Sequence, residues 1–405
     1  MSLTTSAPAL ETVPAADDAA AAQVSEIPGE GQASPTIFRR AGRGIVSAYD
    51  WIFGLGTIMV GLAVLSVIPV LNFFSLGYLL EVSGRVARGG RFRDGFVGIR
   101  KASRLAGFLI GAWLVMLPAQ FAASMWNDAE LISSGSRIAT TWRVVLIALT
   151  LLGFLQIAWA SVRGGRLRHF LWPAPVRAFR ALRKPRWNAW REMGDRAGDW
   201  FVSLRLPHYF WLGFRGFVAA VMWLAVPVAI LIGAAQIPAD GVALLVNLVG
   251  AALLVIVVLY LPFLQAHFAQ TDRFEAMFQV KQVRDLFRRA PIAFWFALFI
   301  TLLFALPLYL LKIELTPQEV AWLPALFFVI FIFPARLLAG WAVHRGTQRE
   351  APRFWLFRWM GRLAAVPVVI AYVFFVWATQ YLSWHGSLSL LEQHAFLVPA
   401  PLFGL

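Results

Sequence analysis

The sequence lacks cysteine altogether and is poor in acidic residues. Without cysteine the chain has no disulfide bond, no thiolate nucleophile and no cysteine-ligated metal. It has 21 acidic residues against 36 lysines and arginines, and 14% of its residues are charged. A soluble globular chain has about a quarter of its residues charged, so this composition excludes an ordinary soluble protein.

The chain contains long apolar stretches and few charged residues. The chain is 60% hydrophobic, and runs of about 20 apolar residues recur from Trp51 onward, the length that a helix needs to cross a bilayer. Unbroken runs such as 242–264 do not alternate as the strands of a membrane β-barrel do. We therefore predict an all-α, polytopic transmembrane helical bundle of about eight spans, at 51–72, 105–126, 142–162, 214–236, 241–263, 292–311, 320–342 and 363–383.

The N-terminal segment has a different composition. Residues 1–35 contain no lysine or arginine and are rich in alanine, proline, serine and threonine. A signal peptide needs a positive start and an apolar centre, and both are missing here. We predict a disordered tail at 1–44, a transmembrane domain at 45–383 and a short C-terminal tail at 384–405.

Lysine and arginine concentrate in every second segment between the predicted spans. Segments 85–104, 163–206, 264–291 and 343–362 hold seven, eleven, five and five of them, whereas the intervening segments hold one or none. Basic loops stay on the cytoplasmic side of a membrane. The pattern predicts a multi-pass protein of the cytoplasmic (inner) membrane, with these four segments inside and the C-terminus outside.

The first apolar stretch, 51–80, does not fit this alternation because cations flank it on both sides. It is long for one span and short for two, and Pro69 and Asn72 could turn the chain midway. Two interpretations remain: one tilted span with the N-terminus outside, or a re-entrant hairpin with the N-terminus inside. We favour the single span, since seven cations follow the stretch and three precede it.

The basic segment 163–206 is amphipathic and rich in tryptophan and arginine. Such a surface suits the headgroup region of a bilayer, and it could equally pack against the protein's own spans. Arg177, Arg180 and Arg183 are candidate contacts to lipid. The net charge of +15 is attributed to anionic lipid headgroups, with no nucleic-acid partner.

Ionisable residues inside predicted spans are few, and no Asp or Glu falls in the middle of one. Arg336 is the deepest charge, and Arg215 begins the fourth span; both are candidate contacts to a lipid or an anion. Snorkelling or a structural contact is the favoured interpretation for Arg336, with binding of a lipid phosphate or substrate anion as the other. We find no motif for a catalytic, metal or cofactor site, and therefore expect none of these.

A short motif resembles a known family. The run Ile68-Pro69-Val70, then Ser75-Leu76-Gly77-Tyr78-Leu79-Leu80-Glu81-Val82, is similar to the opening of the bacterial membrane-protein family called domain of unknown function 4013. The stretch 272–278 resembles its second half, so the resemblance covers about 60–120 and 255–310. It implies a helical membrane protein with no known activity and makes Pro69, Gly77 and Tyr78 its signature positions. From the residues alone, Gly77 permits close helix packing and Tyr78 suits an interface anchor.

An internal repeat is suggested by two similar segments. Arg91-Phe92 is followed by Phe96, and Arg273-Phe274 is followed by Phe278, each pair lying between an apolar stretch and a further span. The distances from these pairs to the flanking prolines differ between the copies, so duplication stays open.

These features favour a non-enzymatic membrane protein whose basic loops contact anionic lipid or a protein partner. The alternative is a transporter or permease subunit for a small or anionic substrate, using Arg336. A lipid-modifying enzyme is the third hypothesis. Whether the chain forms a homo-oligomer is left open by the sequence.

Overall fold

The computed structural model describes residues 37–163, 167–172, 202–310, 322–381 and 386–388, with the single residues 195, 199 and 390. Contacts divide the chain into two units, Met1–Tyr49 and Asp50–Leu405. In the first unit the described residues are the beginning of helix α1 (Ile37–Val67). The helix therefore starts inside the segment 1–44 that was predicted as a disordered tail, and the rest of that tail lies outside the described residues.

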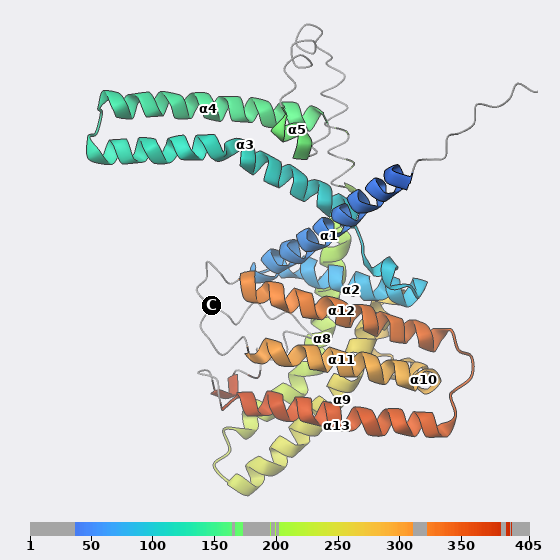
Figure 1. Ribbon diagram of the computed structural model, residues 1–405. Coiled ribbons are helices and arrows are strands. Elements are labelled where there is room, and N and C mark those ends of the chain that lie inside the picture. The colour runs from blue at the N-terminus through green and yellow to red at the C-terminus, as the bar shows by residue number, and fades with distance from the viewer. Residues whose placement is uncertain are drawn as a thin grey trace, which may run out of the picture. The chain divides into compact units, whose positions relative to one another are not determined.

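The described residues are helical and contain no strand, as the all-α prediction required (Figure 1). Six helices, α3, α4, α8, α9, α12 and α13, are long and apolar enough to cross a membrane. Helix α11 adds a seventh candidate span when it is joined to α10, which meets it at 111°. The elements after α1 are α2 (Asn72–Gly89), η1 (Phe92–Gly95), α3 (Ile99–Ile132), α4 (Arg137–Val162), α5 (Leu167–Leu171), α8 (Leu206–Ala234), α9 (Asp240–Thr271), η2 (Phe274–Phe278), α10 (Val280–Arg289), α11 (Pro291–Leu310), α12 (Trp322–Thr347), α13 (Trp355–Thr379) and η4 (Gly386–Leu388).

The stretch 51–80 is two helices, so the favoured interpretation as one tilted span is wrong. Helix α1 ends at Val67 and α2 begins at Asn72. Proline has no N–H to continue a helix, and the residue after Pro69, Val70, takes a left-handed φ of 68° that reverses the chain. The turn lies where the hairpin interpretation expected it, while the side of the membrane on which the N-terminus lies stays a prediction.

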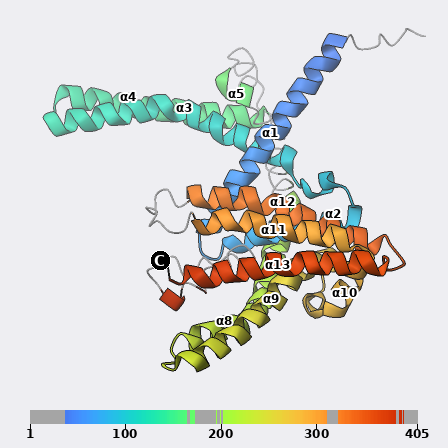
Figure 2. The same ribbon diagram turned by 60° about the horizontal axis from the view of Figure 1, so that its bottom comes forward.

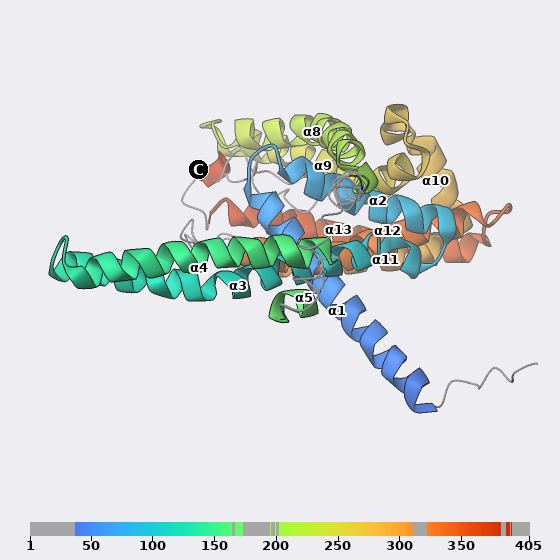
Figure 3. The ribbon, with the colours of Figure 1, turned by 90° about the horizontal axis from the view of Figure 1, so that it is seen from above.

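Helix α2 is the centre of the packing. Figure 3 shows it between α8 and α9 on one side and α12 on the other, and it contacts all three. Small residues allow these close crossings, since a Cβ at Gly77 would overlap the backbone of α8 and one at Gly84 would overlap the backbone of α9. Helix α11 lies between α12 and α13 (Figure 2). The core is therefore built around a helix that is not itself one of the candidate spans.

The two segments of the suggested repeat have the same local backbone. Helices α2 and α9 each end in a left-handed residue, Gly90 with φ 76° and Asp272 with φ 54°. An extended arginine follows in both, Arg91 and then Arg273, and a 3-10 turn comes next. After the turn the first copy runs on into α3, whereas the second inserts the short helix α10 before α11. This insertion accounts for the longer distance from Arg273 to the following proline, whereas the distances from the preceding prolines differ because Pro69 lies in the turn before α2 and Pro262 lies inside α9.

Candidate functional site: the basic end of the bundle

The described parts of all four basic segments are joined to one another by hydrogen bonds. We call this region the basic end, and define it as residues 85–104, 202–206, 264–291 and 343–362. The bonds between segments are Lys101 Nζ to Ser203 O at 2.9 Å, Arg88 Nη1 to Ala269 O at 2.7 Å, His344 Nδ1 to Ala87 O at 3.0 Å, and Arg353 N to Arg288 O at 3.0 Å. Segments that are far apart in the sequence therefore share one end of the bundle.

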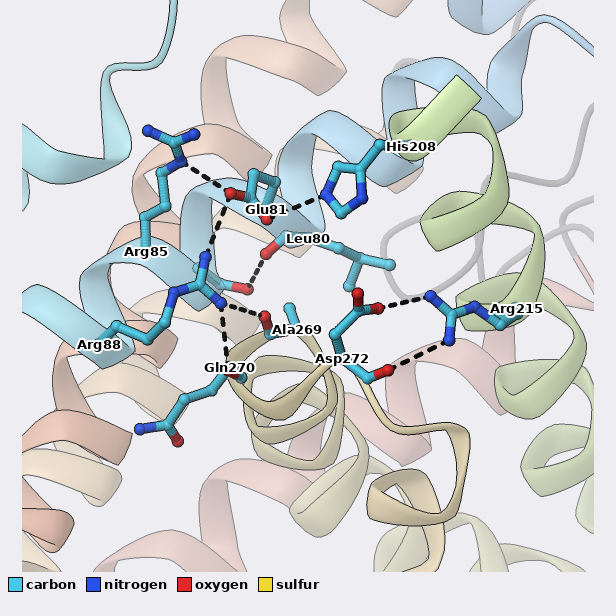
Figure 4. Close-up of polar contacts among 10 residues, drawn as sticks. Leu80, Glu81, Arg85, Arg88, His208, Arg215, Ala269, Gln270 and Asp272 are labelled. Carbon is cyan, nitrogen blue, oxygen red and sulfur yellow. Dashed lines mark hydrogen bonds and ion pairs between the residues drawn. The ribbon is translucent and has the colours of Figure 1, made fainter. Parts of the chain in front are cut away.

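A buried carboxylate, Glu81 of α2, lies beside the basic end (Figure 4). Its Oε1 accepts hydrogen bonds from Arg85 Nε at 2.7 Å and from Arg88 Nη2 at 3.1 Å. The Nε2 atom of His208 on α8 lies 3.5 Å from Oε2. A buried carboxylate is tolerated only when cationic donors compensate its charge, as they do here. The cluster holds α2 to the start of α8.

Arg88 also joins α2 to the end of α9. Its Nη1 donates to the carbonyls of Ala269 and Gln270, at 2.7 and 3.1 Å. These carbonyls belong to the last turn of α9, where a helix has no internal donor for them. In return, Gln270 Nε2 donates to the carbonyl of Ala87 at 3.3 Å. Two helix ends thus satisfy each other's backbone groups.

Arg215, a predicted lipid contact, is paired within the protein. Its guanidinium donates to the carbonyl and the carboxylate of Asp272, the left-handed residue that ends α9. It also lies over the rings of Trp211 and Phe268, at 5.9 and 5.5 Å from their centroids. These contacts give Arg215 a role in joining α8 to α9.

Arg336 lies inside the bundle, 5% exposed, and does not extend to the surface. Its Nη1 donates to Oε1 of Gln265 on α9, a side chain that is itself fully buried. A charge at this depth requires polar partners from the protein, because lipid and apolar side chains offer none. Arg336 therefore connects α12 to α9.

The family-like positions lie at the turn and on α2. Pro69 lies in the turn after α1, and Gly77 faces Gly213 of α8. Tyr78 is 9% exposed, and its hydroxyl donates to the carbonyl of Val97 at 2.9 Å. It is thus a buried side chain and differs from the interface anchor that its position suggested. Arg177, Arg180 and Arg183 lie outside the described residues.

Sequence reasoning missed two features of the basic end. Glu81 directly follows the apolar stretch 51–80, and Arg85 comes four residues later, the spacing that brings side chains together on a helix. The arginines at 345, 349 and 353, also four apart, line a cavity beside Pro291. Among the described residues, no group of three or more His, Cys, Asp or Glu could hold a metal ion.

The helices define the class: the chain is a multi-pass α-helical membrane protein. Residues 201–315 match the model of a family described as "Protein of unknown function (DUF4013)". This match confirms the resemblance predicted from the sequence, and it contains the predicted second region, 255–310. The first region, 60–120, lies outside the matched residues. No curated protein matches the chain, and no solved structure matches it.

Proposed function

We propose that the protein is a non-enzymatic component of the bacterial inner membrane whose basic end binds anionic phospholipid at the cytoplasmic face. The observation that carries this proposal is the meeting of the four basic segments at one end of the bundle. The negative potential of the cytoplasmic leaflet attracts each nearby Lys or Arg by about 1 kcal/mol. A surface that gathers cations from four segments adds these attractions together.

The cations available for lipid are those that do not hold the helices together. Arg85, Arg88 and Arg215 bind Glu81, Asp272 or helix carbonyls. By contrast, the side chains of Arg91, Arg93 and Arg100 are exposed around η1 and the start of α3. We expect exposed guanidinium groups beside the first turn of a spanning helix to lie at the depth of lipid phosphates. They are the part of the basic end that we expect to contact the bilayer.

We expect the full chain to be more stable in bilayers that contain phosphatidylglycerol than in pure phosphatidylcholine. A lipid that binds the folded state preferentially raises the melting temperature. The measurement is thermal unfolding in nanodiscs of the two compositions with matched acyl chains. High salt should shrink the difference, since it screens exposed charges. Equal melting temperatures at low salt would rule the proposal out.

The proposed orientation places the basic end in the cytoplasm. Green fluorescent protein fused after Arg93 or after Glu350 should then be fluorescent. Alkaline phosphatase fused at the same positions should be inactive. A fusion after Ile237, in the short connection between α8 and α9, should give the opposite result. The reverse pattern at all three positions would contradict the orientation, even though the bundle itself would be unchanged.

A further inference from the structure

A cavity of about 210 Å³ lies where the end of α12 meets the start of α11. Three arginines line it, Arg345 at the end of α12 and Arg349 and Arg353 in the connection to α13. Among the described residues that line the cavity, none is acidic. Three cations around one space without a carboxylate repel one another, so the cavity is suited to an anion.

Each of these guanidinium groups is positioned by one contact and keeps further donors free for a ligand. Arg345 lies over the ring of Trp341 at 5.4 Å, and Arg353 lies over that of Phe357 at 5.4 Å. Arg349 donates from Nη1 to the carbonyl of Arg289 at 3.2 Å, at the end of α10. A guanidinium has five N–H donors, so one such bond leaves four. Partial burial, followed by the charges of Arg353 and Arg345, lowers the pKa of Arg349.

The N-terminus of α11 also lines the cavity. The helix begins at Pro291 and runs for 20 residues, and Ile292 and Ala293 also line the cavity. The first N–H groups of a helix have no acceptor within it, and the helix dipole places partial positive charge there. Helix N-termini bind phosphate for this reason. The three arginines and this N-terminus line the same cavity.

We propose that this cavity binds a phosphate group, that of an anionic phospholipid headgroup or free phosphate. This inference rests on the proposed function, since it gives the basic end one defined lipid site. A lipid source agrees with Trp341, whose ring lines the cavity near the end of a candidate span, the depth at which tryptophan meets headgroups. Arginine suits this role because its planar donors bind two phosphate oxygens at once.

The test uses the full chain in detergent, where bilayer electrostatics does not contribute. Native mass spectrometry measures the retention of phosphatidylglycerol, and thermal unfolding measures the effect of excess inorganic phosphate. The variant is Arg345→Gln/Arg353→Gln, which keeps Arg349 and its bond to α10. The matched control is Arg137→Gln/Arg143→Gln, which removes the same charge from exposed positions outside the basic end.

We expect the cavity variant to bind at least about tenfold more weakly, since it loses the charged donors of two of the three arginines. The control should bind as the parent does. A loss confined to phosphatidylglycerol identifies a headgroup, and a loss confined to inorganic phosphate identifies a free anion. Equal losses in both variants, or no loss in the cavity variant, would overturn the site. The bilayer experiment above could still succeed in that case, so the two proposals fail separately.

Discussion

Replacing Gly77 with alanine is expected to separate α2 from α8 and to destabilise the fold by about 3 kcal/mol, at the upper end of overpacking costs. A Cβ at this position would overlap the carbonyl oxygen of Tyr209 and lie 2.9 Å from the nitrogen of Gly213. Both are backbone atoms of a continuous helix, so no side chain can move aside to make room. The measurement is thermal unfolding of the purified protein, together with the fraction that elutes as a single species.

The matched control is Gly233→Ala on α8, where an added Cβ would meet nothing within 4 Å. Alanine favours a helix over glycine by about 1 kcal/mol, so this variant should be as stable as the parent or slightly more so. If Gly77→Ala and Gly233→Ala melted together, α2 and α8 would not cross as closely as the structure shows.

Gln265→Leu is expected to destabilise the protein by about 3 kcal/mol, since it removes an acceptor from a buried cation. Arg336 donates to Gln265 Oε1 where both side chains are buried. Removing the charge itself is less costly, because a neutral amide that loses a partner costs about 1–3 kcal/mol. Arg336→Met should therefore melt above Gln265→Leu.

The double variant Arg336→Met/Gln265→Leu provides the control. With the buried cation and its acceptor both gone, stability should return toward that of the parent. Additive losses in the double variant would show that the two side chains do not act as a pair. A double variant that folds normally would also allow the transporter hypothesis to be tested, since any transport that depends on Arg336 would be lost without unfolding.

The sequence predicted the spans well because each depends on local composition. A run of apolar residues long enough to cross a bilayer must be helical wherever it lies, and seven of the eight predicted spans overlap a candidate span when α10 and α11 count as one. The first, 51–72, overlaps α1, whose apolar part Trp51–Val67 is too short to be one. The turn near Pro69 was visible for the same reason, since proline interrupts a helix locally.

The central role of α2 was not visible. Glu81 and Arg85 make it look like the edge of a span, and only its contacts with α8, α9 and α12 show that it is buried.

The candidate site was predicted only in outline. Counting cations predicted which segments lie together at one end of the bundle. It did not distinguish a cation that is paired within the protein, such as Arg215 with Asp272, from one that lines a cavity, such as Arg349. That distinction depends on partners distant in sequence, such as Asp272 for Arg215 and Pro291 for the arginine cavity. Arg336 illustrates the same limit, because its depth was evident from the sequence and its acceptor was not.

The hydrogen bonds of Arg88 and His344 connect the charges of the basic end to the ends of helices α9 and α2. Helices α2, α9 and α12 all end at the basic end, and their carbonyls carry partial negative charge there. Under the proposed orientation, the cations that direct insertion are partly the same ones that neutralise these helix ends, as Arg88 does for α9. A change in charge that inverted the protein in the membrane would also remove these contacts. Under the proposed orientation we therefore expect orientation and tertiary structure to be selected together, with a dual-topology form disfavoured.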